Sequence, residues 1–319
     1  MDALLKKALN IRYVKLRFEL EILEDTILPK NKAPALRGGM GEMLLRANCI
    51  RDRQCKKCDF EEECIVNRIK YSKIENKPSF MNEGDSVGYV FECEDYKEMF
   101  REGDILKFNL ILFGSTIVYL NQILQAFFMF GEVGIGKNAS KFLVKRIRNT
   151  RKEVLLEDGQ IYKPMYEIAT VNDYVDSRIK HVKNCSRIIW HTPAAIKQKG
   201  CLIEEFSSEA IFAAICRRIL MLDCYEKIET EKINISDKLP YIMRQEVYKK
   251  SIRRYSSTHD EGIYLKGITG IVDFDYIDYY MYKLLLAGEL IHIGKNTSFG
   301  FGKYILTERK SEDESYNKD

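Results

Sequence analysis

Apolar and polar positions follow two periods along the first half of the chain, one typical of strands and one typical of helices. Residues 12–23 alternate between the two classes, and Glu102-Gly103-Asp104 predicts a turn between two later strands. The predicted elements are a strand (12–23), a short helix (34–47), two strands (89–93 and 104–113), a helix (115–130) and a strand (140–149). Their order is β-α-β-β-α-β.

The second half repeats this order. The predicted elements are a strand beginning at 187, a helix (207–225), two hairpin strands (249–258 and 262–274), a helix (275–288) and a strand (303–308). Ser207, at the start of the first of these helices, is a residue type favoured at the N-cap. Two copies of the pattern predict an α+β protein of tandem ferredoxin-like (RRM-like) β-α-β-β-α-β domains.

A length of 319 residues is typical of about two domains, in agreement with this pattern. The predicted regions are an N-terminal ferredoxin-like domain (1–150) with a cysteine-rich insertion (49–64), a linker (151–185), a C-terminal ferredoxin-like domain with a glycine-rich loop (186–310) and a disordered tail (311–319). The tail is acidic and poor in apolar residues, which favours disorder.

Two loops at corresponding positions of the halves share a sequence. The first reads Gly131-Glu-Val-Gly-Ile-Gly-Lys-Asn-Ala-Ser140, and the second reads Gly288-Glu-Leu-Ile-His-Ile-Gly-Lys-Asn-Thr-Ser298. Both contain Gly-Glu, then Ile-Gly-Lys-Asn, a small residue and Ser. Self-similarity across half a chain indicates two structural units of one kind. A loop of glycine and lysine at a helix end suits the binding of a phosphate backbone.

The first loop also comes close to an ATP-binding loop, because Gly131 and Gly136-Lys137 have the spacing of that motif. The next residue is Asn138, which lacks the hydroxyl that would hold magnesium. The predicted context is also reversed, with a helix before the loop and a strand after it. The sequence therefore disfavours an NTPase.

Composition narrows the cellular setting. Hydrophobic residues make up 45% of the chain, enough for packed cores. No apolar run approaches the ~20 residues of a membrane span, and the N-terminus lacks the apolar segment of a signal peptide. We therefore expect a cytoplasmic protein without a membrane partner. Because the net charge is only +4, a nucleic acid must meet local basic patches.

Two such patches are present. Residues 137–152 carry seven Lys and Arg, and Lys249, Lys250, Arg253 and Arg254 form a second cluster beside tyrosines. Tyrosine next to cations suits single-stranded RNA, whose bases stack on aromatic rings. The alternative is that each patch is the solvated face of a strand.

The insertion carries four of the nine cysteines at regular spacing. Cys55 and Cys58 have the spacing of a zinc knuckle, and Cys49 and Cys64 flank them at five intervening residues on each side. We expect a structural zinc site formed by these four thiols. An iron–sulfur cluster and a metal-free loop of thiols are the alternatives.

Several segments together resemble a known family. Gly288-Glu-x-x-His-Ile-Gly-Lys-Asn-Thr-Ser-Phe-Gly-Phe-Gly-Lys-Tyr304 resembles the C-terminal glycine-rich signature of the RAMP superfamily. Within it, the chain is similar to the CRISPR endoribonucleases that cut precursor CRISPR RNA inside its repeats. Leu36-Arg-Gly-Gly-Met-Gly41 is similar to the first-helix motif of that family, and the cysteine insertion is similar to one in that family. Residues 119–136, Thr192-Pro193 and Arg217-Arg218 also match.

This resemblance implies a metal-independent endoribonuclease that cuts precursor CRISPR RNA by attack of a ribose 2′-hydroxyl and releases guide RNAs. It implies repeat and guide RNA as ligands, and an effector complex and a second copy of the chain as further candidate partners. No cofactor is expected for catalysis. The alternative is a non-catalytic RAMP subunit that holds guide RNA in an effector complex.

Such cleavage needs a base, an acid and a cation, and histidine suits both proton roles. Many of these nucleases have a histidine on or near the first helix, where this chain has none. His292 lies in the second loop, at a position that the shorter first loop lacks. We therefore expect His292, Lys295 and Arg37 to be catalytic. His292 could instead cap a backbone carbonyl, and His191 is the second candidate.

The expected RNA-binding residues lie in both loops and in the second basic cluster. They are Gly294, Lys295, Asn296, Thr297, Gly300, Gly302, Lys303, Lys137, Lys249, Lys250, Arg253 and Arg254.

Overall fold

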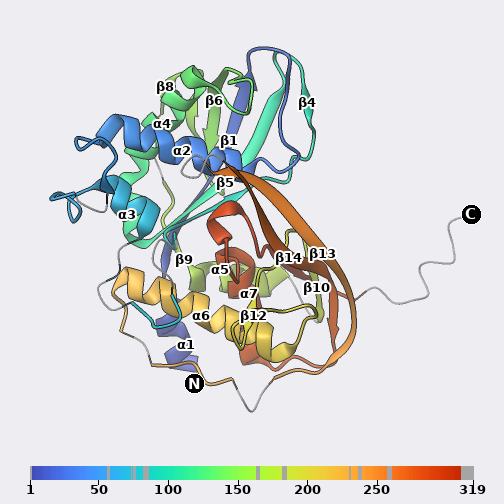
Figure 1. The fold of residues 1–319 in the computed structure, drawn as a ribbon. Coiled ribbons are helices and arrows are strands. Elements are labelled where there is room, and N and C mark those ends of the chain that lie inside the picture. The colour runs from blue at the N-terminus through green and yellow to red at the C-terminus, as the bar shows by residue number, and fades with distance from the viewer. Residues whose placement is uncertain are drawn as a thin grey trace, which may run out of the picture.

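The computed structural model has a mixed α+β fold with antiparallel sheets, which confirms the predicted α+β class (Figure 1). It describes residues 2–55, 58–72, 74, 77–81, 86–162, 166–181, 185–229, 231–235, 239–256 and 261–309. The tail that the sequence predicts to be disordered, 311–319, lies outside the described residues.

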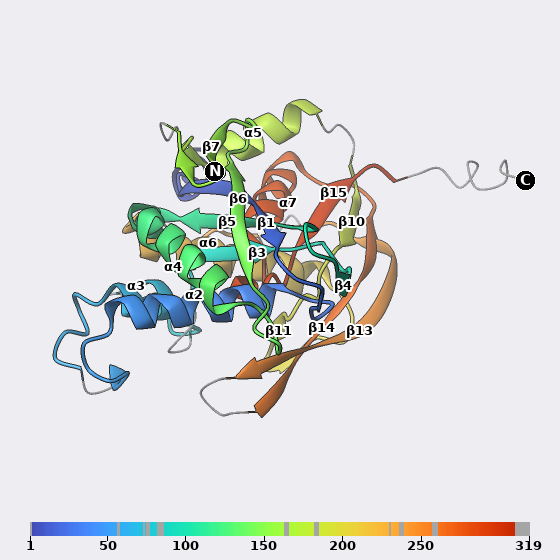
Figure 2. The ribbon, with the colours of Figure 1, turned by 90° about the horizontal axis from the view of Figure 1, so that it is seen from above.

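The first half forms one sheet covered by helices on one face. The strand order is β3 (Tyr89–Glu92), β5 (Ile105–Phe113), β1 (Arg12–Ile22), β6 (Phe142–Arg148), β7 (Val154–Glu157) and β8 (Gln160–Ile161). Phe18 of β1 lies opposite Phe108 of β5, and their stacked rings have centroids 4.9 Å apart. Helices α2 (Ala33–Asn48) and α4 (Leu120–Val133) lie side by side over this core (Figure 2).

The other elements in this part of the chain are short. They are helix α1 (Asp2–Ala8), which packs in the core of the second half, the paired strands β2 (Thr26–Ile27) and β4 (Met99–Phe100), helix α3 (Ile65–Tyr71) and the 3₁₀ helix η2 (Gly114–Tyr119). Helix α1 was not expected from the sequence. The helix predicted at 115–130 begins as η2 and continues as α4.

Glycine at position 39 lets α2 and α4 approach closely. A Cβ there would lie 2.0 Å from the ring of Phe130 on α4. The neighbouring Gly38 has nothing within 4 Å of its Cβ position, because it faces away from the core. Close packing on this side fixes α2, and with it Arg37, against the first sheet.

The second half forms a sheet of four strands. Their order is β13 (Ile242–Ser256), β14 (Glu261–Phe274), β10 (Arg187–Trp190) and β15 (Tyr304–Thr307). Helices α6 (Ser208–Glu226) and α7 (Tyr279–Ile291) pack together in the core of this half. The side chain of Ser207 accepts a hydrogen bond from the backbone N–H of Ala210 at 3.1 Å, so the predicted N-cap is confirmed. In the first sheet β1 lies between β5 and β6, and in the second sheet β10 lies between β14 and β15, so the two strand orders correspond.

The described residues of the segment predicted as a linker (151–162, 166–181 and 185) are folded against both halves. Strands β7 and β8 extend the first sheet, and β9 (Ala169–Thr170) pairs with the start of β1. Helix α5 (Val171–His181) then packs on α7, where Arg178 pairs with Glu289 at 3.0 Å. This segment is therefore part of the packed structure rather than a free connection.

The two halves also share a core. Val90 and Ile111 of the first sheet are buried in one cluster with Ile215 of α6 and Leu290 of α7. Strand β3 contributes to both cores, because its residues are buried on both faces. This apolar contact holds the halves in a defined relative position.

Strands β13 and β14 form a long hairpin that leaves its own sheet and reaches α2 of the first half (Figure 1). The sequence places the start of β13 at residue 249, but the strand begins at Ile242. The hairpin brings residues of the second half beside Arg37. Among the described residues, no helix combines the length and apolar character needed to cross a membrane.

Candidate functional site

A cleft of about 520 Å³ opens where α2, α6, the hairpin and the second glycine-rich loop meet. Its described lining contains no Asp and no Glu. The cationic side chains that line it are Arg37, Lys197, Lys199, Arg217, Arg218, Arg254 and Lys295. A concave surface lined by one sign of charge concentrates ligands of the opposite sign, here anions such as phosphates.

Two arginines in this cleft share one aromatic ring. Arg37 of α2 lies 4.5 Å from the ring centroid of Phe299, and Arg254 of β13 lies 5.1 Å from it. The Nε atoms of both arginines are buried without a hydrogen-bond partner among the described residues. Burial, and then the charge of Arg37, lowers the pKa of Arg254. Two desolvated like charges destabilise each other, so a bound anion would stabilise this arrangement.

The glycine-rich loop that carries Phe299 runs from His292 to Gly302 and contains η3 (Thr297–Phe299). Gly302 has φ of 72°, and a Cβ on it would lie 1.9 Å from the carbonyl oxygen of Ile293. Backbone hydrogen bonds from Lys295 to Ala195 (2.8 Å) and from Gly302 to Pro193 (2.9 Å) fix both ends of the loop. The loop is therefore a rigid wall of the cleft.

The structure divides the residues that the sequence assigns to this loop. Gly294, Lys295, Asn296 and Thr297 line the cleft, as an RNA-binding role requires. Gly300 and Gly302 are buried and shape the loop from behind. Lys303 lies outside the cleft lining, with its ammonium group 2.6 Å from Glu94. Its predicted RNA contact does not fit this position.

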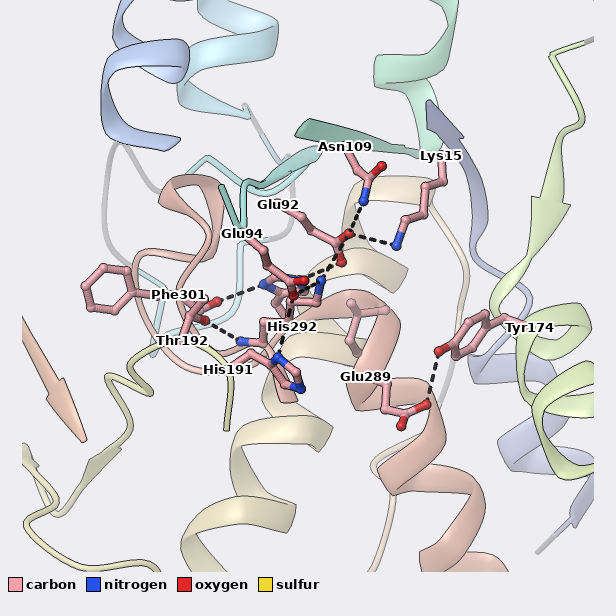
Figure 3. Close-up of polar contacts among 12 residues, drawn as sticks. Lys15, Glu92, Glu94, Asn109, Tyr174, His191, Thr192, Glu289, His292 and Phe301 are labelled. Atoms are coloured by element: carbon pink, nitrogen blue, oxygen red, sulfur yellow. Dashed lines mark hydrogen bonds and ion pairs between the residues drawn. The ribbon is translucent and has the colours of Figure 1, made fainter. Parts of the chain in front are cut away.

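His292 does not reach the cleft. Its side chain is fully buried; its Nδ1 lies 2.9 Å from the carbonyl oxygen of Phe301 and its Nε2 lies 3.2 Å from Glu92 (Figure 3). Burial lowers the pKa of His292, and the carboxylate of Glu92 opposes that shift. Both partners are acceptors, so a neutral ring, with one N–H, can donate to only one of them. In this structure the buried His292 side chain lies outside the cleft lining, so a proton-transfer role does not fit this arrangement, and the assignment stays a prediction.

The second histidine candidate lies in a different cleft. His191 is 39% exposed, with Nδ1 3.7 Å from Glu94 (Figure 3). Its surroundings mix charges, since Lys15, Glu92 and Lys303 line the same hollow. Carboxylates at this position disfavour a phosphate backbone.

Alternate residues of the hairpin strand β13 face opposite sides, so Lys249 and Arg253 lie on the face opposite to Arg254. Lys250 shares the face of Arg254 but lies four residues before it along the strand. Arg254 lines the cleft, whereas Lys249 pairs with Glu204 at 2.9 Å. Lys250 and Arg253 are exposed and outside the cleft lining. The four residues are one cluster in sequence, and only Arg254 joins the site.

The first basic run is mostly neutralised on its sheet. Lys145 pairs with Glu21 at 2.7 Å, and Arg146 pairs with both Glu19 and Glu157. Lys137 is exposed in the first loop and is not among the lining residues of the cleft. The solvated-face alternative therefore fits this run better than an RNA-binding role.

Some cleft residues were not assigned from the sequence. Lys197 begins β11 (Lys197–Gln198), and Lys199 lies in the turn to β12 (Cys201–Leu202); no motif marks either residue. Arg217 lines the cleft and donates to the carbonyl of Lys197 at 3.2 Å. Its neighbour Arg218 is 2% exposed and donates to the carbonyl oxygens of Ile291 and Val87. Both residues of the Arg-Arg pair noted in the sequence thus border the cleft, and Arg218 also connects α6 to the backbone of α7 and of the first half.

The four cysteines of the insertion lie around one hollow of about 310 Å³. Cys49 follows α2, Cys64 precedes α3, and the backbone N–H of Arg53 lies 3.2 Å from the sulfur of Cys49. Within the described residues, however, no three metal-binding side chains are close enough to hold an ion. The expected zinc site is not supported by this arrangement.

Family models match both halves of the chain. Residues 9–172 match the model AF_1859_N, described as an N-terminal domain. Residues 188–304 match the model described as CRISPR-associated endoribonuclease Cas6. This second match contains the glycine-rich loop, Arg217 and Arg254. No curated protein matches the chain.

Two solved structures share the fold. A chain of a "Partial Cas6-RT-Cas1--Cas2 complex" is 11% identical, with a TM-score of 0.56 over 94% of this chain and 46% of that one. A chain of a "Cas6-RT-Cas1--Cas2 complex" gives the same identity, TM-score and coverage of this chain, and is covered over 29% of its own length. The chain thus spans less than half the length of either. Residues 9–172, about half of the chain, thus place it in the AF_1859_N family, and residues 188–304 match the family of the CRISPR-associated endoribonuclease Cas6.

Proposed function

We propose that the chain is a metal-independent endoribonuclease that cuts precursor CRISPR RNA within its repeats and produces guide RNAs. The observation that carries this proposal is the cleft of seven cationic side chains without a carboxylate. The match of residues 188–304 to the Cas6 endoribonuclease model supports the substrate class. Repeat and guide RNA are the proposed ligands, whereas an effector complex, a homodimer and a cytoplasmic location are predictions from the sequence.

In this proposal the RNA backbone lies across the loop, with the cut phosphate at the Arg37–Phe299–Arg254 stack. The ribose 2′-hydroxyl gives its proton to a solvent water and attacks the adjacent phosphorus, forming the bond to the 2′-oxygen while the bond to the 5′-oxygen breaks. The guanidinium groups stabilise the charge of the phosphorane, as fixed donors do in other phosphoryl transfers. Lys295, on the cleft wall, is the proposed acid that protonates the leaving oxygen.

No histidine is among the described residues that line the cleft. Catalysis would then rest on positioning of the 2′-hydroxyl and on electrostatic stabilisation, which together lower the barrier without a histidine pair. The same observation favours the second candidate function, a non-catalytic RAMP subunit that only holds guide RNA.

One assay tests the reaction and separates the two candidates. The purified protein is incubated in EDTA with the repeat RNA of its own locus, with and without a 2′-deoxyribose at the cut position. We expect cleavage of the RNA to a cyclic phosphate and a 5′-hydroxyl, and binding without cleavage of the deoxy substrate. A strict need for a divalent ion, or cleavage of the deoxy substrate, would contradict the mechanism. Tight binding without any cut would favour the non-catalytic subunit.

We also propose that each half is a ferredoxin-like unit. The shared strand order and the repeated loop sequence support this proposal. The two units would then hold the RNA between them, with the second supplying the complete glycine-rich loop.

A metal at the cysteine insertion is a further proposal, zinc in preference to an iron–sulfur cluster. Four thiols around one hollow could close on an ion, since structural metal sites couple binding to local folding. Elemental analysis should find about one metal per chain. The double variant Cys55→Ser/Cys58→Ser should lose it, while Cys201→Ser, at an exposed thiol elsewhere, should keep it. Metal-free protein whose insertion resists proteolysis as well as the rest of the chain would contradict this.

A further inference from the structure

A buried polar cluster joins the two halves behind the cleft (Figure 3). Glu92, at the end of β3 in the first half, is 2% exposed and lies 3.2 Å from His292 of the second half. Its other oxygen lies 2.8 Å from the ammonium group of Lys15 and accepts a hydrogen bond from Asn109 at 2.9 Å. Lys303 approaches the same oxygen at 3.5 Å. Four polar side chains from both halves therefore meet at the Glu92 carboxylate.

We propose that Glu92 and His292 are a positioning pair that sets the glycine-rich loop against the first half and thereby aligns the two arginines of the cleft. This inference rests on the proposed function, because it assigns the pair a role in RNA cleavage. Arg37 belongs to the first half and Arg254 to the second, and both contact Phe299 of the loop. Their spacing depends on where the loop lies between the halves.

The glycine-rich loop packs closely against β3 of the first half. The 3₁₀ helix η3 packs on β3, and a Cβ on Gly300 would lie 2.7 Å from the carbonyl oxygen of Phe91. His292 also holds the far end of the loop through the carbonyl of Phe301. One imidazole thus connects the beginning of the loop, its end and the neighbouring strand.

Apolar contacts alone would define this position less sharply. The shared core of the halves is non-directional and tolerates small shifts, whereas a buried hydrogen-bonded pair has one favourable geometry. Loss of either partner would leave the other buried without its hydrogen bond, which is costly. A shift of the loop by about 1 Å can reduce the rate of a positioned reaction about 10²-fold.

The test compares Glu92→Gln, His292→Gln and the double variant with a matched control. The control is Asp273→Asn, which weakens a buried pair with Arg187 (2.7 Å) that lies wholly within the second half. Single-turnover cleavage at saturating repeat RNA, RNA affinity and hydrogen exchange of the loop amides are measured below the melting temperature of every variant.

We expect each single variant to cut about 10–100-fold more slowly, with RNA affinity changed less than about threefold. The double variant should be no slower than the slower single variant, because the two residues act as one unit. The amides of Lys295 and Gly302 should exchange faster than in the wild type. Asp273→Asn should lose stability but keep the wild-type rate and loop exchange.

Two results would overturn the inference. One is a wild-type cleavage rate in both single variants; the other is slower cleavage with unchanged loop exchange, the result that proton transfer by His292 would give. If the wild type binds repeat RNA without cutting it, the proposed function fails, and loop exchange alone decides. Faster exchange in the Glu92 and His292 variants but not in Asp273→Asn then supports the positioning pair, and equal exchange rejects it.

Discussion

Replacing Arg37 with alanine should slow cleavage of the repeat RNA by about 10²–10³-fold, the usual effect of removing one donor that stabilises a transition state. Arg37 is in the cleft, its Nε has no partner among the described residues, and its charge lies beside that of Arg254. An attacked phosphate gains negative charge, so both guanidinium groups stabilise it more than they stabilise the bound substrate. Single-turnover kinetics at saturating RNA measure this effect directly.

Two further variants sharpen this prediction. Arg37→Lys keeps the charge but loses the planar contact with Phe299, so its rate should fall between those of the wild type and the alanine variant. Arg151→Ala removes an exposed arginine that pairs with Glu167 on the first half, and should change the rate less than about twofold. Arg254→Ala should match Arg37→Ala, and the double variant should lose less than the product of the two effects, because both residues would act on one phosphate.

The prediction is wrong if Arg37→Ala and Arg254→Ala both cut at the wild-type rate. In that case the cationic cleft would bind RNA without acting at the cut phosphate. The reaction would then have to occur elsewhere on the surface, and the mixed-charge hollow that contains His191 would be the next place to test.

Much of the fold could be predicted, because the hydrophobic period of an element and its turn residues are local properties of the sequence. The strand at 12–23 and the helix at 34–47 appear at β1 and α2 within one residue at each end. The start of β13 was missed by seven residues, because residues 242–248 do not alternate between apolar and polar, although they pair with β14 in the sheet. The segment 151–185 lacked clear periodicity, and its strands are only two to four residues long.

The site was harder to predict because its chemistry depends on distant partners. Ile291-His292-Ile293 is equally compatible with an exposed turn and a buried one, and the carboxylate that decides the matter lies 200 positions away at Glu92. Likewise, the basic run 137–152 contained no sign that carboxylates on neighbouring strands would pair with it. Charge counts along a sequence therefore overestimate the cations available to a ligand.

Arg37 and Arg254, in contrast, were both assigned to function from the sequence and do lie in the cleft. Each is one of many arginines in the chain, and only the approach of the hairpin to α2 places both on Phe299. The sequence assigned both to function for separate reasons, one from a family resemblance and the other from a cluster of cations. Neither reason predicted that they would meet.

Replacing Gly302 with alanine should lower the free energy of unfolding by about 2–5 kcal/mol, from two separate costs. A side chain at φ of 72° costs about 1–2 kcal/mol, because this left-handed region crowds a Cβ. The Cβ would also meet the carbonyl oxygen of Ile293 at 1.9 Å, and overpacking of this kind costs about 1–3 kcal/mol. Urea denaturation with an unchanged m-value would measure the sum.

Gly103→Ala is the matched control. Gly103 has φ of 84°, and nothing lies within 4 Å of its Cβ position, so this variant should lose only the first cost. The difference between the two variants isolates the contact between the glycine-rich loop and Ile293. Because Ile293 directly follows His292, relief of that contact would displace the loop, and RNA affinity should fall in Gly302→Ala but not in Gly103→Ala. If the two variants lose equal stability, the loop can accommodate a side chain at Gly302, and the close contact with Ile293 would not be the reason for glycine there.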